Sequence, residues 1–167
     1  MRQPAVRNQL NRTVAKFDGL PTPLRRLALS FVLGNVVPYI GTSKLRFDEL
    51  KSERVVVSVK NRRRVQNHIK NVHAAAMALL AETATGFCVT MNLPDDKLPL
   101  IKTLKVDYLK RTQGDMRAVA QLSPEQIRLI QTLDKGEVTV PVSITDASGG
   151  EPISAEMVWA WVPKKRG

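Results

Sequence analysis

One segment limits the fold more than any other, an alanine-rich helix expected over residues 72–89. Alanine is the strongest helix former, and it occupies positions 74, 75, 76, 78, 81 and 84 of this segment. A helix that is apolar nearly all round is a buried helix, because no face of it favours water. We therefore expect other elements to wrap this helix on several sides.

Alternating apolar residues on both sides of the helix predict β-strands. Before it, Leu45 and Phe47 pair with Val55, Val57 and Val59 in a predicted hairpin. After it, the alternating runs are Leu104, Val106 and Tyr108; Met116, Ala118, Ala120 and Leu122; Val138, Val140, Val142 and Ile144; and Ile153, Ala155, Met157, Trp159 and Trp161. Gln113-Gly114-Asp115 is the predicted turn between the first two, and Ser123-Pro124 starts a short helix. Such short connections exclude parallel crossovers, so we expect an α+β fold with one curled antiparallel sheet.

Two further helices are predicted ahead of the first strand. Val6, Leu10, Val14 and Phe17 have helical spacing, and Pro21-Thr22-Pro23 opens a second helix that Gly34-Asn35 can cap. The apolar side of that second helix comprises Leu24, Leu27, Ala28, Phe31 and Val32. We expect this side to pack on the domain; the alternative is a helix that contacts a membrane surface or a partner. The predicted division is an N-terminal helical extension, residues 1–42, and a domain over residues 43–167.

The chain of 167 residues carries a net charge of +11. Residues 1–64 hold 14 Lys and Arg against 4 Asp and Glu, a net +10, and residues 65–167 hold 12 against 11, a net +1. A basic excess suggests a polyanionic partner such as nucleic acid, an anionic membrane or a phosphorylated small molecule. Aromatic residues make up only 5% and do not interleave with the basic runs, which argues against nucleic acid as the partner.

Several classes of site and segment are excluded or disfavoured. One cysteine, Cys88, allows no intramolecular disulfide and no cysteine-based zinc cluster. His68 and His73 are too few to form a metal site by themselves, so no metal is expected. The longest apolar run has 14 residues, 27–40, against ~20 for a membrane span. We expect a cytoplasmic protein without a transmembrane segment or a cleaved leader.

Glu82 is the one acid between Glu53 and Asp95, and it lies in the middle of the alanine-rich helix. Burying an ionised carboxylate is costly unless it is paired or hydrogen-bonded, so its presence suggests a function. The alternative is a Glu82 that points to solvent or pairs with a basic side chain.

This segment resembles the central helix of hot-dog fold acyl-CoA thioesterases, specifically the PaaI-like branch and an uncharacterised family close to it. That motif is an Asn, a His-Gly-Gly beginning six residues later, and an acid nine residues after the His. Asn67, His73-Ala74-Ala75 and Glu82 stand at these spacings, with Ala-Ala in place of Gly-Gly and Glu in place of the usual Asp. The stretch from Thr103 to Leu109, followed by Gly114, resembles the family's next strand, and the whole resemblance covers residues 43–162.

The resemblance implies hydrolysis of an acyl-CoA thioester at a site shared across a dimer. Helix geometry agrees, because nine residues at ~100° each place His73 and Glu82 on opposite sides of the helix. One chain would supply Asn67 to hold the carbonyl or the attacking water and the Ala74 N–H as oxyanion donor, with His73 orienting the loop. The other chain would supply Glu82 as general base or nucleophile. Arg62, Arg63, Arg64, Lys110 and Arg111 are the candidate clamp for the CoA phosphates. Coenzyme A belongs to the substrate, so no separate cofactor is expected, and the assembly would be a homodimer or a dimer of dimers.

Two other functions stay open at this stage. A non-catalytic acyl-CoA or fatty-acid binding protein is favoured by Ala74-Ala75, whose methyl groups narrow the pocket. A nucleic-acid binder is favoured only by the charge of the N-terminal part.

Overall fold

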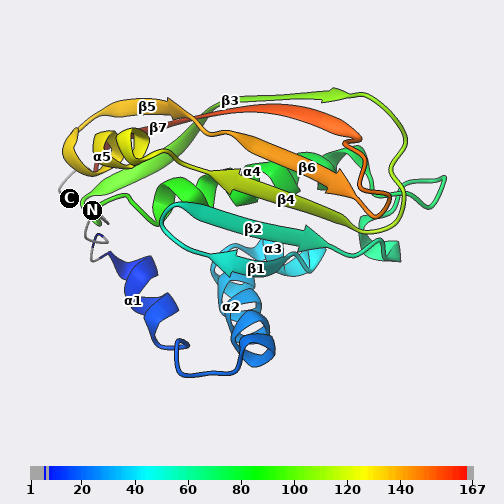
Figure 1. Ribbon diagram of the computed structural model, residues 1–167, viewed down its shortest axis with the longest axis horizontal. Helices are drawn as coiled ribbons and strands as arrows, with labels where there is room; N and C mark the ends of the chain where they lie inside the picture. Colours follow the sequence, from blue (N-terminus) through cyan, green and yellow to red (C-terminus); the bar gives the residue numbers. More distant parts are fainter. Residues whose placement is uncertain (1–5, 7, 165–167) are drawn as a thin grey trace.

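The computed structural model describes residue 6 and residues 8–164 as an α+β chain (Figure 1). The helices are α1 (Gln9–Ala15), α2 (Thr22–Val36), α3 (Pro38–Ser43), the 3-10 turn η1 (Arg63–Val65), α4 (Ala74–Thr90) and α5 (Pro124–Thr132). The strands are β1 (Arg46–Leu50), β2 (Arg54–Val59), β3 (Lys97–Tyr108), β4 (Met116–Gln121), β5 (Gly136–Thr139), β6 (Val142–Asp146) and β7 (Ile153–Pro163). The order of helices and strands agrees with the sequence, apart from α3 and η1, which were not predicted, and one predicted strand that forms two.

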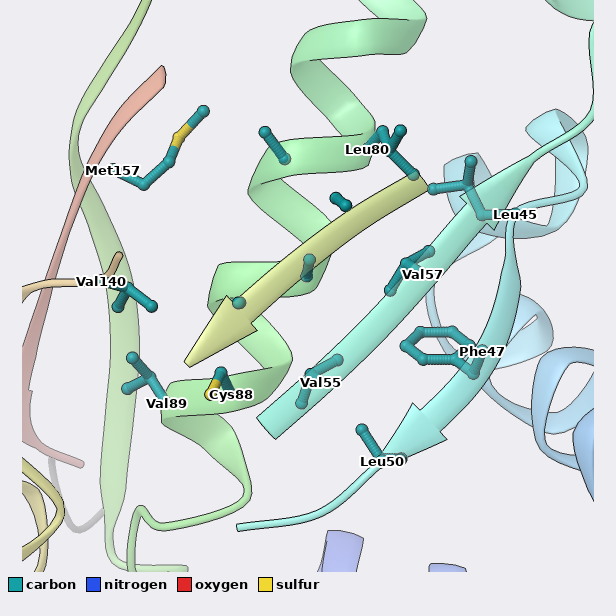
Figure 2. Packing of buried hydrophobic residues seen from close by; sticks show 14 of the residues in the cluster. Leu45, Phe47, Leu50, Val55, Val57, Leu80, Cys88, Val89, Val140 and Met157 are labelled. Carbon is teal, nitrogen blue, oxygen red and sulfur yellow. The ribbon is translucent and has the colours of Figure 1, made fainter. Parts of the chain in front are cut away.

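Helix α4 is the predicted alanine-rich helix and lies at the centre of the core. It contacts β2, β4 and β6 on one side and β3 and β7 on another. Leu80, Ala81, Ala84, Cys88 and Val89 are fully buried, which requires cover from several directions. Figure 2 shows Leu80, Cys88 and Val89 on this helix among apolar side chains of β1, β2 and β7. The expectation of a helix wrapped on several sides is therefore confirmed.

The strands form two antiparallel sheets, where the sequence predicted one. The strand order is β1-β2-β4-β6 in one sheet and β3-β7-β5 in the other. The hairpin of β1 and β2 is as predicted. The turn at residues 113–115 does not join a hairpin, because β3 pairs with β7 whereas β4 pairs with β2 and β6. It carries the chain from one sheet to the other, and Gly114 accommodates its φ of 68°.

The predicted continuous strand from Val138 to Ile144 is also divided between the sheets. Pro141 stands at the division, and proline has no N–H to donate to a strand ladder. Just before it, the Val140 N–H still donates to the Met157 carbonyl of β7. Just after, the Pro141 carbonyl accepts from the Gln121 N–H of β4. The chain thus changes sheets at Pro141, and β5 and β6 connect the two layers.

Helix α2 packs by a different side from the one that the sequence predicted. Leu24, Leu27 and Phe31 are 53%, 57% and 72% exposed, and Leu29 and Leu33 are buried instead. Helix α2 crosses α3 closely at Gly34, where an added Cβ would lie 2.9 Å from the Gly41 Cα. This close crossing fixes which side of α2 is buried. The predicted Gly34-Asn35 cap is wrong as well, since α2 continues to Val36 and Pro38 opens α3.

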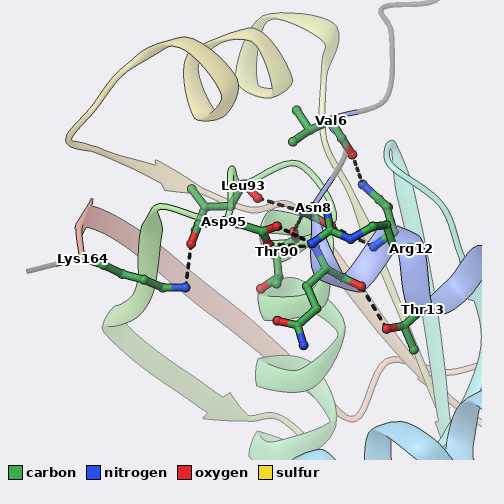
Figure 3. Close-up of polar contacts among 10 residues, drawn as sticks. Val6, Asn8, Arg12, Thr13, Thr90, Leu93, Asp95 and Lys164 are labelled. Atoms are coloured by element: carbon green, nitrogen blue, oxygen red, sulfur yellow. Dashed lines mark hydrogen bonds and ion pairs between the residues drawn. The ribbon is translucent and has the colours of Figure 1, made fainter. Parts of the chain in front are cut away.

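Helix α1 attaches the N-terminal segment to the far end of α4 (Figure 3). The Asn8 side-chain amide, 2% exposed, donates to the Thr90 carbonyl at 2.7 Å and to the Leu93 carbonyl at 2.8 Å. The Asn11 amide donates to the Met91 carbonyl at 2.8 Å. Asn8 and Asn11 thus supply donors to carbonyls at and just beyond the end of α4, so α1 caps the C-terminal end of the core helix. Arg12 and Asp95 add an exposed ion pair.

Within residues 6 and 8–164, no helix combines the length and the apolar character that crossing a bilayer requires.

Candidate active site

The N-terminal end of α4 presents a free backbone donor. His73 is the N-cap, and its Nδ1 accepts the Ala75 N–H at 3.0 Å. The N–H of the preceding residue, Ala74, donates no hydrogen bond within the described chain. Unsatisfied N–H groups and the helix dipole make such an end attractive to a negatively charged oxygen. His73 thus caps the helix, and the Ala74 N–H is left without a partner in the described chain.

Asn67 shapes the loop that leads into α4. Its side-chain oxygen accepts the N–H groups of Ile69 and Asn71, both at 3.1 Å, and its own N–H donates to the Asn71 carbonyl. The His73 N–H donates to the Val65 carbonyl, which closes the loop against η1. The side-chain oxygen of Asn67 is thereby engaged, so it is the NH₂ group that remains for a substrate or water.

Tyr108 is a neighbour of this end that sequence reasoning missed as a site residue. It ends β3, and its hydroxyl donates to the Ala74 carbonyl at 2.9 Å. Partial burial raises the pKa of the phenol, so the hydroxyl keeps its proton and remains a donor. The alternation at Leu104, Val106 and Tyr108 places these residues on one face of β3, but it gives no sign that the last one meets the helix end.

Glu82 lies in the middle of α4 and is half-buried. Burial raises the pKa of its carboxyl above the ordinary value, and no Lys, Arg or His forms an ion pair with it in the described chain. Neither alternative foreseen for this acid, full exposure or a basic partner, is therefore present in the single chain. A carboxyl with a raised pKa and no basic partner has the character of a general base.

A single chain does not bring the two halves of the predicted site together. Ala74 and Glu82 are eight residues apart on the same helix, a rise of ~12 Å. Asn67, His73 and Ala74 gather at one end of α4, whereas Glu82 is two turns further along.

Glu82 instead faces a cavity of about 440 Å³ between the N-terminal helices and α4. Its walls come from α1, from the end of α2 and start of α3, from α4, and from β3 and β7. Thr83 also lines it and is 1% exposed. Trp159 forms part of the wall by lying against Gly86, where an added Cβ would be 2.6 Å from the indole ring.

The predicted phosphate clamp lies at the N-terminal end of α4. Arg62, Arg63 and Arg64 precede that end, and Lys110 and Arg111 follow β3, at the right of Figure 1. The Asn61 N–H donates to the Asp115 carboxylate at 2.9 Å, which holds the two loops side by side. All five cations are exposed, and none forms an ion pair with a described acid.

Other chemistries find no support in the described residues. Burial raises the pKa of the Cys88 thiol to about 12, so this cysteine is not a nucleophile at neutral pH. Across residue 6 and residues 8–164, His, Cys, Asp and Glu form no group of three that could hold a metal ion.

A family model described as "Domain of unknown function (DUF4442)" matches residues 25–162. The chain belongs to this DUF4442 family. The match begins within α2, so the family includes most of α2 and all of α3. A search of curated proteins found no match to this DUF4442 chain.

Solved structures with the same fold include proteins described as thioesterases. A Pseudomonas aeruginosa protein of unknown function, described as a probable thioesterase, is 23% identical with a TM-score of 0.73, over 87% of this chain and 97% of its own. A thioesterase family protein from Silicibacter pomeroyi has 15% identity and a TM-score of 0.63, over 81% and 96%. A Haemophilus influenzae thioesterase has 10% identity and a TM-score of 0.59, over 75% and 82%. At these identities the likeness establishes the fold and leaves the reaction to be argued from the site.

Proposed function

We propose that this DUF4442 protein is a hot-dog thioesterase that hydrolyses acyl-CoA to the free acid and CoA. The observation that carries the proposal is Glu82, a carboxyl of raised pKa, without an ion-pair partner in the described chain, on the wall of an apolar cavity. The fold shared with proteins described as thioesterases supports it. The free Ala74 N–H at the start of the same helix supplies the second half of the chemistry.

The active unit is a homodimer formed through β3, alone or within a dimer of dimers. β3 is an edge strand of 12 residues, and such an edge presents unpaired backbone groups that invite pairing. Large apolar side chains along it are exposed, namely Leu98, Leu100, Ile101, Leu104 and Tyr108. Antiparallel pairing of two β3 strands about a two-fold axis also reverses α4, which packs on β3. The Ala74 end of one helix then approaches the Glu82 region of the other.

The reaction follows from this pairing. The thioester carbonyl oxygen accepts from the Ala74 N–H of one protomer, where the helix dipole stabilises the developing oxyanion. Asn67 positions the carbonyl or the water through its NH₂ group. Glu82 of the other protomer takes a proton from water as the water oxygen attacks the carbonyl carbon, and the C–S bond then breaks. The CoA thiolate leaves and receives that proton; direct attack by Glu82, giving an anhydride, is the alternative route.

The five exposed cations bind the CoA phosphates at the oxyanion end. Phosphate oxygens pair well with arginine, and Arg62–Arg64 and Lys110–Arg111 flank the helix end that receives the carbonyl. Coenzyme A is part of the substrate, so the mechanism uses no separate cofactor. Because acyl-CoA esters occur inside cells, a cytoplasmic location is part of the proposal.

The test is release of free CoA from a panel of acyl-CoA thioesters by wild type and by Glu82→Gln. This substitution keeps the shape of the side chain and removes its charge. General-base catalysis is worth about 10²–10⁴-fold, so kcat should fall at least a hundredfold without loss of the fold. Glu125→Gln, on the exposed start of α5, is the matched control. Wild-type turnover by Glu82→Gln would refute this assignment, and tight acyl-CoA binding without turnover by wild type would favour the binding-protein alternative.

A further inference from the structure

The cavity between the N-terminal helices and α4 has the form of a binding site for a linear apolar group. Most of its wall is aliphatic or aromatic, with contributions from Leu10 of α1, Leu33 of α2, Ile40 of α3 and Phe87 of α4. Its volume of about 440 Å³ lies in the range of ~300–1,000 Å³ that is typical of small-molecule sites. Such a space fits an alkyl chain better than a charged or aromatic heterocyclic group.

The cavity follows α4 from Glu82 to Thr90, which gives the occupant a direction. Glu82 and Thr83 line one end, Gly86, Phe87 and Thr90 follow along α4, and Asp95 and Lys164 line the cavity beyond the end of the helix. The helix rises ~12 Å from Glu82 to Thr90, about the length of an extended acyl chain of ten carbons. A thioester held at Glu82 would therefore direct its acyl chain along α4 and beneath α1.

We propose that this cavity binds the acyl chain and that α1 and the end of α2 form the wall that sets the preferred chain length. The proposal rests on the proposed function and names its substrate class, a medium-length linear acyl group. The wall is held firmly in place, because the buried Asn8 side chain attaches α1 to the carbonyls of Thr90 and Leu93. The N-terminal segment thus acts as a specificity element of the same protomer that supplies Glu82.

Thr13 offers the sharpest test, because it lines the cavity from α1 and is half-buried (Figure 3). Thr13→Leu and Thr13→Phe fill the cavity in two steps, and Thr and Phe have similar helix propensities. Ala15→Phe is the matched control, since Ala15 is exposed on the same helix and is not part of the cavity wall.

The measurements are kcat/KM over acyl-CoA esters from two to sixteen carbons, and the affinity for free decanoate by calorimetry. Wild type should prefer chains near ten carbons. Each excluded methylene costs about fourfold, so Thr13→Phe should lower the ratio of decanoyl-CoA to butyryl-CoA kcat/KM at least tenfold, with Thr13→Leu between. Decanoate affinity should fall in parallel, and Ala15→Phe should match wild type in both measurements.

The decanoate measurement separates this inference from the hydrolase proposal. Decanoate binding that Thr13→Phe weakens supports the acyl cavity even if no ester is hydrolysed, in which case only the proposed reaction fails. If a folded Thr13→Phe, judged by its melting temperature, leaves both the chain-length profile and the decanoate affinity unchanged, the cavity is not the acyl site. Failure of wild type to bind decanoate overturns the inference in the same way.

Discussion

Glu82 is both ionisable and partly buried, and burial disfavours its charged form. Its partial burial raises the pKa of the carboxyl above the ordinary value of 4.5, because the charged form loses contact with water. The folded chain therefore holds this proton more tightly than the unfolded chain does. A carboxyl of this kind adds stability when protonated and subtracts it when ionised.

The stability of wild type and Glu82→Gln should consequently diverge with pH. The favourable contribution of Glu82 is fully present below the unfolded pKa and is lost as pH rises through the raised folded pKa. Gln cannot ionise, so the melting temperature of Glu82→Gln should exceed that of wild type increasingly as pH rises from about 4.5 toward 8. Thermal melts of both proteins across this range provide the measurement. A difference that stays constant with pH would show that Glu82 is solvated in the folded protein.

The sequence predicts only part of the environment of Glu82. An isolated acid in an alanine-rich helix indicates burial, and the spacing from Asn67 and His73 indicates the motif. The cavity beside Glu82 could not be foreseen, because Thr13, Leu33 and Trp159 in its wall lie far apart in the chain. Contacts of Tyr108 with the helix end depend on how β3 crosses α4, which alternation does not encode.

At the level of helices and strands, the periodicity of the sequence predicted which elements form better than it predicted how the strands pair. Helix α4 follows from its alanine content, and strands β2, β4 and β7 follow from the alternation of their apolar residues. Pro141 was the available signal that the run from Val138 to Ile144 is two strands, because a proline interrupts a ladder. The buried side of α2 depends on the contact of Gly34 with Gly41, and apolar periodicity alone selected the exposed side.

The buried Asn8 side chain is a principal attachment of helix α1, beside Asn11 and the Arg12–Asp95 ion pair. Asn8→Ala would remove the α1 N-cap bond to the Asn11 N–H and leave the carbonyls of Thr90 and Leu93 without these donors. Losses of this kind cost about 2 kcal/mol in the free energy of unfolding. For a chain of this size the melting temperature should fall by roughly 4–8 °C.

Asn35→Ala is the control for that measurement. Asn35 is exposed and its amide donates to the Phe31 carbonyl of its own helix, so its removal should change the free energy of unfolding by less than about 0.5 kcal/mol. Equal losses for the two variants would mean that Asn8 does not anchor α1.

At the scale of the whole molecule, the proposed dimer rests on the exposed β3 edge and on the separation of Ala74 from Glu82 within one chain. This arrangement can be tested by complementation between two inactive variants. Asn67→Ala removes a group from the oxyanion half, and Glu82→Gln disables the basic half. A heterodimer of the two regains one intact site, so co-refolding equal amounts should restore roughly a quarter of wild-type activity.

The same mixture distinguishes a shared site from a site within one chain. If both halves belonged to one protomer, every site in the mixture would carry one of the two lesions, and activity would stay at the level of the separate variants. Light scattering on wild type provides the accompanying check, because an active monomer at assay concentration would contradict the dimer.

The capping of α4 by Asn8 also has a consequence for the order of events during synthesis. The carbonyls that Asn8 binds lie 82 and 85 residues later in the chain. At ~5–20 residues per second, the ribosome needs roughly 4–16 s to make them after Asn8 has been added. During that interval the basic N-terminal segment has no core to dock on, and Leu10 and Leu33 are exposed. We expect this segment to be a client of ribosome-associated chaperones until the end of α4 emerges.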